Sequence, residues 1–90
     1  MQYLKSDDQV FETIGNYGDN KVVVVKFGAA WCGPCNSLAP QLENLASSYA
    51  SNPDVAFASV DVDECGGASK ELGIASLPTI KFFKKGQYLG

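Results

Sequence analysis

The residues best suited to chemistry are two cysteines, Cys32 and Cys35, in the sequence WCGPC. They follow an apolar run that predicts a buried strand, and a helical pattern begins at about Pro34. Residues three positions apart on a helix share one face, so the two sulfurs can reach each other. A C-x-x-C pair beside a β-α-β pattern indicates thiol–disulfide redox chemistry in a cytosolic chain.

The position of the pair, between an expected strand and an expected helix, predicts a role for each sulfur. The amides of a first helical turn lack partners, and the helix dipole adds about half a positive charge there. Because a thiolate is stabilised at that point, Cys32 is predicted to attack a substrate disulfide. Cys35, one turn further and more buried, is predicted to resolve the mixed disulfide. Pro34 suits the first turn, where its missing amide costs no hydrogen bond.

Two other interpretations of the cysteines remain open: inert core residues or a static disulfide, and a zinc site. Zinc requires four protein ligands, or three and a water molecule. The chain has three cysteines and no histidine, and the nearby carboxylates are only Asp61, Asp63 and Glu64. The sequence therefore favours the redox pair, and no bound metal is expected.

The elements that must position the pair alternate between strand and helix. Strands are predicted over residues 2–5, 21–27, 55–62 and 79–83, with a further strand beginning at 87–89, and helices over 34–50 and 68–72. Ser6 and Gln9 fit a capping box for a first helix that carries apolar residues up to Tyr17. The run at 21–27 is typical of a strand covered on both faces. Turns are predicted at 18–20, 52–54 and 85–86.

Length and composition exclude several classes of protein. Ninety residues are sufficient for one domain, and no apolar run approaches the ~18 residues of a membrane span. The amino-terminal residues lack the apolar core and cleavage site of a secretory signal, which favours a cytoplasmic location. The chain has no arginine and a net charge of −3, which argues against nucleic-acid binding.

The order of motifs resembles the thioredoxin family. The resemblance rests on WCGPC preceded by VVVVKFGAA, on Pro40, on VDVDE at 60–64 and on SLPTIKFFKKGQ at 76–87. It implies a three-layer α/β/α sandwich with a central mixed β-sheet. It also implies a protein-disulfide reductase, an electron carrier that holds no bound cofactor. Its expected partners are disulfide-containing protein substrates and the NADPH-dependent thioredoxin reductase that returns it to the dithiol form.

The resemblance also assigns a substrate surface. The Leu77–Pro78 bond is expected to be cis, and the backbone of Leu77 to hydrogen-bond the substrate main chain. The flat apolar patch expected to meet substrates comprises Trp31, Ala75, Ser76, Leu77 and Pro78. Gly33 and Pro34 form the dipeptide that sets the reduction potential within the family. This dipeptide resembles that of reducing thioredoxins, whereas the more oxidising isomerases usually carry a histidine in place of Pro34.

Lys26 departs from the family pattern. Thioredoxins usually have a buried aspartate there, which accepts the proton of the resolving cysteine and often pairs with a lysine on the next strand. Ser59 stands at that second position. Three hypotheses remain for Lys26: a general base when deprotonated, a cation that stabilises the Cys32 or Cys35 thiolate, or a solvated amine on a packed stem.

Cys65 is a second departure. Some eukaryotic thioredoxins have an additional cysteine near this position, linked to regulatory oxidation or dimerisation. Cys65 precedes two glycines and is expected at an exposed, flexible helix start. Asp63 and Glu64 oppose activation of its thiol, so a passive thiol is favoured over a regulatory one.

The third departure is the end of the sequence at Gly90, because the family continues with the rest of a hairpin strand and a final helix. Residues 1–90 are thus expected to form a single thioredoxin domain without these parts. Their absence predicts an open edge at strand 79–83 and uncovered apolar sheet surface. Either the sequence is a fragment of a longer protein or the domain is completed by swapping or dimerisation, and a marginal or associating monomer is expected. The alternative function is a non-catalytic binding module with a thioredoxin fold, which the intact WCGPC and Pro78 oppose.

Overall fold

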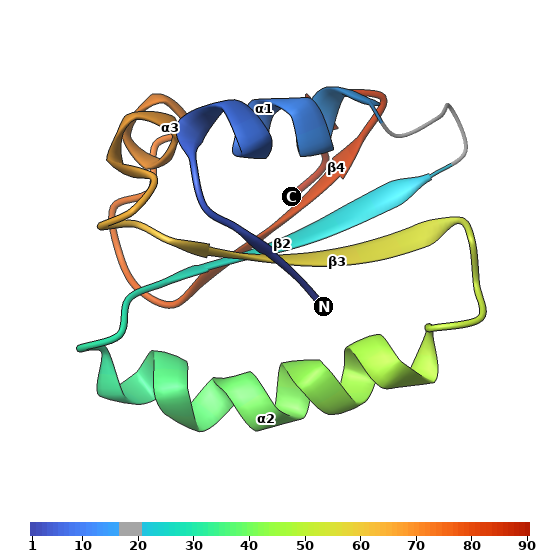
Figure 1. The fold of residues 1–90 in the computed structure, drawn as a ribbon, viewed down its shortest axis with the longest axis horizontal. Coiled ribbons are helices and arrows are strands. Elements are labelled where there is room, and N and C mark those ends of the chain that lie inside the picture. Colours follow the sequence, from blue (N-terminus) through green and yellow to red (C-terminus); the bar gives the residue numbers. More distant parts are fainter. Residues whose placement is uncertain (17–20) are drawn as a thin grey trace.

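The computed structural model describes residues 1–16 and 21–90, which form three layers with one mixed sheet in the middle. The sheet has five strands in the order β1-β3-β2-β4-β5. Helices α1 and α3 cover one face, and α2 covers the other (Figure 1). The elements in chain order are β1 (Gln2–Leu4), α1 (Asp7–Asn16), β2 (Val22–Gly28), α2 (Gly33–Ser48), β3 (Val55–Asp61), α3 (Gly66–Glu71), β4 (Thr79–Lys84) and β5 (Gln87–Tyr88). The predicted α/β/α sandwich is confirmed.

Strand β2 lies at the centre of the sheet. It runs parallel to β3 and antiparallel to β4, and β1 runs parallel to β3. Lys26 pairs with Ser59 and Gly28 pairs with Asp61, which confirms that Ser59 stands across from Lys26. Because parallel strands end at the same edge of a sheet, β2 passes into the cysteine segment beside the end of β3.

The core explains why residues 21–27 form a strand. Val23, Val25 and Phe27 are almost fully buried on the face toward α1 and α3. Alternation places Val24 and Lys26 on the opposite face, toward α2. Burial of each large apolar side chain stabilises the fold by about 1.5–3 kcal/mol relative to exposure. The strand that supports the cysteines is therefore held from both sides.

The predicted start of α1 and the predicted end of α3 are both observed. The amide of Gln9 donates to Ser6 Oγ at 3.2 Å, so Ser6 caps α1. Gln9 Oε1 accepts from the amide of Lys5 at 2.6 Å, one residue earlier than in a capping box. Gly73 ends the α3 segment with a φ of 73°, in the left-handed region that glycine favours. The expected positions of Tyr17 and of the turn at 18–20 lie outside the described residues.

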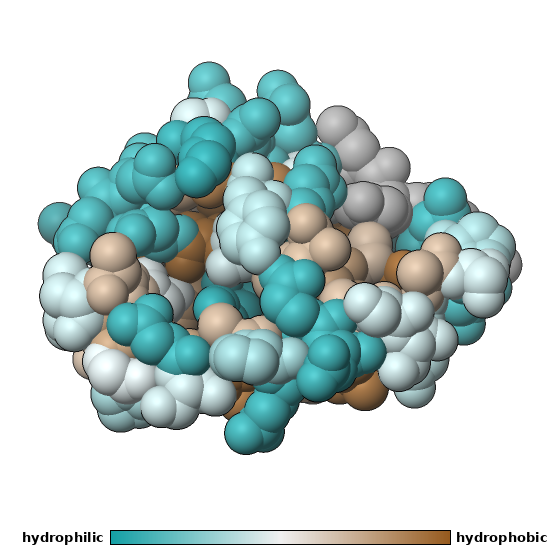
Figure 2. All heavy atoms as spheres, turned by 60° about the horizontal axis from the view of Figure 1, so that its bottom comes forward, coloured by the Kyte–Doolittle hydropathy of each residue, from teal (hydrophilic) through white to brown (hydrophobic). Residues whose placement is uncertain are grey.

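The predicted open edge at strand 79–83 is wrong near its end. Strand β5 pairs with β4 there, and Leu89 and Gly90 exchange backbone hydrogen bonds with Phe82 at 2.7 and 3.0 Å. Apolar surface is uncovered, as expected, in a groove of about 340 Å³ between α2 and the sheet. Figure 2 shows apolar atoms among hydrophilic side chains with the α2 side turned forward. No helix in the described ranges is long and apolar enough to cross a membrane.

Candidate active site

Cys32 and Cys35 are joined by a disulfide at the start of α2, with 5.3 Å between their Cα atoms. Cys32 is the residue before the first helical turn, in an extended conformation. Its Sγ accepts a hydrogen bond from the amide of Cys35 at 3.2 Å. The sulfur thus occupies the place of a capping oxygen, where the reduced thiolate is stabilised by a backbone donor and the helix dipole.

Both sulfurs lie in a small apolar cluster. Cys32 is 5% exposed and Cys35 2%, so the expected order of burial holds by a narrow margin. Ala29 belongs to the same cluster, and Val62 and Leu77 pack against it. Another molecule can therefore contact Cys32 only along the surface next to its small exposed part.

That surface is a groove of about 540 Å³ beside Cys32, most of whose lining is apolar. It is lined by Trp31, Cys32, Gly33, Pro34, Val62, Ser69, Ile74, Ala75, Ser76 and Leu77. Four of the five predicted substrate residues lie there, but Pro78 is not among the lining residues, although the Leu77–Pro78 bond is cis as predicted. Sequence reasoning missed Val62, Ser69 and Ile74, which come from segments separate in the chain.

Trp31 is held beside Cys32 by Asp63. The indole Nε1 donates to Asp63 Oδ2 at 2.8 Å, while the ring remains 70% exposed. The amide of Asp63 in turn donates to Asp61 Oδ1 at 2.8 Å. From the sequence, Asp63 is a possible metal ligand and a charge near Cys65, and its contact with Trp31 is not predicted. The described residues contain no group of three or more Cys, Asp or Glu side chains that could hold a metal.

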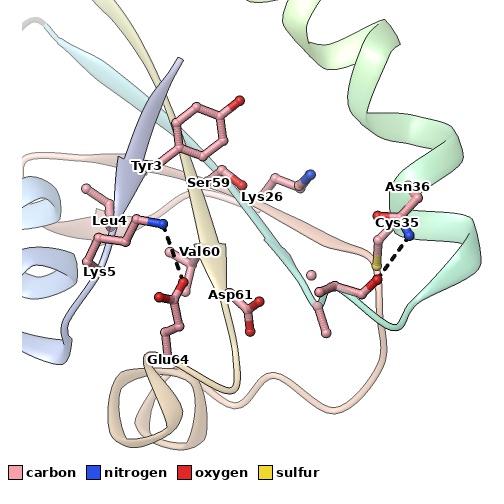
Figure 3. Close-up of a pocket in the computed structure, with 13 residues that line it drawn as sticks. Tyr3, Leu4, Lys5, Lys26, Cys35, Asn36, Ser59, Val60, Asp61 and Glu64 are labelled. Atoms are coloured by element: carbon pink, nitrogen blue, oxygen red, sulfur yellow. Dashed lines mark hydrogen bonds and ion pairs between the residues drawn. The ribbon is translucent and has the colours of Figure 1, made fainter.

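A second pocket, of about 210 Å³, reaches Cys35 from the α2 face of the sheet (Figure 3). Gly28 opens this space, because a Cβ there would lie 3.2 Å from Cys35 Sγ and 3.7 Å from Lys26 Cε. Lys26 Cε is therefore within about 7 Å of Cys35 Sγ, a range at which a charge still affects a thiolate. Tyr3, which also lines the pocket, donates from its hydroxyl to Glu43, and this bond raises the pKa of the phenol.

Lys26 is half-buried in this pocket and is not neutralised by a carboxylate. Among the described residues, no hydrogen bond or ion pair engages its amine. The nearby Glu64 pairs instead with Lys5, at 3.6 Å. Figure 3 shows Lys26 extending from β2 on the side where Cys35 lies. A lysine at this position, in the pocket that Cys35 also lines, carries the opposite sign of charge to an aspartate.

Cys65 is fully buried, so the expectation of an exposed thiol is wrong. Its Sγ donates to the carbonyl of Leu4 at 3.6 Å. Burial, followed by the negative charges of Asp7, Glu64 and Asp61, raises the pKa of the Cys65 thiol. The start of α3 is held in place because Asp7 Oδ1 accepts from the amide of Ala68 at 2.9 Å.

Comparison with known proteins agrees with this geometry. The Thioredoxin family model matches residues 2–90. The chain is 40% identical over 90 residues to the thioredoxin of Callithrix jacchus, a match that covers all of this chain and 82% of that protein. The chain belongs to the thioredoxin family. The family's thiol–disulfide oxidoreductase chemistry accords with the Cys32–Cys35 pair.

Two further matches extend the comparison within the thioredoxin family. The solved structure of Plasmodium falciparum thioredoxin has a TM-score of 0.88 and 32% identity, and the match covers 100% of this chain and 82% of that one. Protein disulfide-isomerase erp38 of Neurospora crassa is 47% identical over 74 residues, which are 80% of this chain and 20% of that protein. This chain is thus also similar to a segment of a protein named as a disulfide isomerase.

Proposed function

We propose that this thioredoxin-family protein is a protein-disulfide reductase. The Cys32 thiolate attacks one sulfur of a substrate disulfide, forms a mixed disulfide and releases the other substrate sulfur as a thiolate. The Cys35 thiolate then attacks Cys32 Sγ, so the Cys32–Cys35 disulfide forms and the second substrate thiolate leaves. The substrate gains two electrons and the dithiol loses two. The observation that carries this proposal is the Cys35 amide on Cys32 Sγ, at 3.2 Å, beside an apolar groove.

The proposed direction is reduction rather than disulfide formation. Gly33 and Pro34 separate the cysteines, and the chain contains no histidine to stabilise a Cys32 thiolate in the way of the more oxidising isomerases. In this scheme the oxidised protein receives electrons from NADPH through a thioredoxin reductase. The protein binds no cofactor of its own and acts on disulfide-containing proteins in the cytoplasm.

Lys26 is proposed to tune the dithiol as a cation. Its Cε lies within about 7 Å of Cys35 Sγ, where a positive charge favours the thiolate over the thiol. The Cys35 thiol would then lose its proton to solvent in the pocket rather than to a buried carboxylate. In this scheme Lys26 affects the protonation of the Cys35 sulfur and does not itself react.

Coupled turnover tests the proposed reductase. Insulin, NADPH and a thioredoxin reductase are mixed with the protein, and NADPH consumption is followed at 340 nm. We expect sustained consumption with the wild type and none with Cys32→Ser or Cys35→Ser. Binding of insulin without consumption, together with no reduction when dithiothreitol is the electron donor, would instead support the binding module.

A further inference from the structure

Ser69 carries a buried hydroxyl that the fold does not use. The residue is 5% exposed, and no polar atom of the described residues forms a hydrogen bond with its Oγ. The backbone amide is satisfied, since it donates to the carbonyl of Cys65 at 3.0 Å. Most buried polar side-chain atoms have a partner, and an unpaired hydroxyl destabilises the folded protein. An alanine would fill the same space without that cost.

Ser69 is one of the residues that line the groove beside Cys32, although its Oγ itself has almost no exposed surface. Ser69 lines this groove together with Trp31, Val62, Ile74 and Leu77, whose contributions are largely apolar. A serine side chain turns about one bond between staggered positions, and its oxygen both donates and accepts. The oxygen must therefore turn about this bond, and its neighbours must shift, before it meets a polar group that enters the groove.

We propose that Ser69 determines substrate specificity by binding a hydroxyl or amide side chain that the substrate carries next to its disulfide. Because Ser69 is deeply buried, a substrate backbone lying along the surface cannot reach it, so the contact requires a side chain that protrudes into the groove. Such a side chain converts an unsatisfied hydroxyl into a hydrogen-bonded one, while an apolar isostere leaves it unpaired. The inference rests on the proposed reductase function and names its preferred substrates.

Peptide disulfides that differ by one isosteric replacement test the proposal. Two pairs carry threonine or valine either directly before or directly after one cysteine, and kcat/KM is measured with NADPH and a thioredoxin reductase. We expect the wild type to prefer threonine by about threefold to tenfold at one of these positions. In Ser69→Ala the preference falls to near one. Ser47→Ala, an exposed serine in α2, is the matched control and keeps the wild-type preference.

The outcomes separate this inference from the function on which it rests. Equal reduction of threonine and valine peptides by the wild type would overturn the role of Ser69 and leave the reductase proposal standing. A preference that survives in Ser69→Ala would do the same. Failure to reduce any of the peptides or insulin would contradict both proposals. Urea unfolding provides a second readout, in which Ser69→Ala is at least as stable as the wild type because no hydrogen bond is lost.

Discussion

Lys26 and Cys35 line one pocket, and both lie close to the position that a side chain on Gly28 would occupy. A Cβ on Gly28 would lie within 4 Å of both groups, 3.2 Å from Cys35 Sγ and 3.7 Å from Lys26 Cε. Among the described residues, no carboxylate forms an ion pair with the Lys26 amine.

Replacement of Lys26 by neutral glutamine should make thiolate formation at the reduced dithiol harder. Over about 7 Å, and after allowance for the solvent around a half-buried lysine, the lost interaction is worth about 0.5–1 kcal/mol. The midpoint of the thiolate absorbance at 240 nm should then rise by about half a pH unit, and by more in Lys26→Asp. The shift should shrink in high salt.

Lys85→Gln is the matched control, since Lys85 is exposed in the β4–β5 turn. It should leave the titration unchanged. If Lys26→Gln also leaves both the titration and the pH–rate curve unchanged, the amine is solvated and has no electrostatic role.

Loss of the Asp63 side chain should weaken substrate binding more than it weakens the fold. Asp63→Ala removes the acceptor for Trp31 Nε1, so the exposed indole is no longer held beside Cys32. We expect KM for a protein disulfide to rise about threefold to tenfold, with a change in tryptophan fluorescence. Asp63→Asn keeps an oxygen acceptor and should lie close to the wild type. Equal KM values for Asp63→Ala and the wild type would show that the tether is irrelevant.

A methyl group at Gly67 should destabilise the protein. A Cβ there would lie 2.4 Å from Asp7 Oδ2, so the carboxylate that caps α3 through the Ala68 amide must move. We expect Gly67→Ala to lower the free energy of unfolding in urea by about 1–2 kcal/mol. Gly66→Ala is the matched control, because nothing lies within 4 Å of its Cβ. Its higher helix propensity should leave stability unchanged or raised. Similar losses for both variants would rule out the Asp7 contact as the cause.

The buried thiol of Cys65 should make stability fall at alkaline pH. Its pKa is raised above the ordinary 9.0 by burial and by Asp7, Glu64 and Asp61. Above pH 9 the unfolded thiol therefore loses its proton while the folded thiol retains it, so the unfolded state is favoured as pH rises. Cys65→Ala should show a flatter alkaline branch in urea unfolding from pH 8 to pH 11. Its tyrosines and lysines remain, so the difference between the two curves isolates the thiol. Identical slopes would contradict the burial of Cys65.

The burial of Cys65 also predicts that its thiol reacts slowly. Cys65 should resist a disulfide reagent in the native protein and react promptly in denaturant. A native Cys65 that reacts at the rate of a free thiol would favour the regulatory role over the passive one.

The parts of the site that could be predicted are those whose cause is local in the sequence. Cys32 and Cys35 follow a buried strand and begin a helix, and local chemistry assigns them. The error at Cys65 has the opposite origin, since two following glycines suggested flexibility. The α3 start is instead capped by Asp7, a residue far away in the chain.

The groove illustrates the second limit of sequence reasoning. Val62, Ser69 and Ile74 carry no motif, and only the fold brings them beside Cys32. The orphan hydroxyl of Ser69 is visible only after the burial of its neighbours is known. Lys26 could be recognised as unusual, but the space that Gly28 opens next to Cys35 required coordinates.

Trapping of the mixed disulfide tests the central claim most directly. Reduced Cys35→Ser is mixed with a substrate protein disulfide, quenched with acid and mapped by mass spectrometry. The account predicts a substrate cysteine joined to Cys32 and none joined to Cys65, while Cys32→Ser yields no adduct. An adduct at Cys35 in Cys32→Ser that forms as fast as the one at Cys32 would contradict the division between attacking and resolving sulfurs.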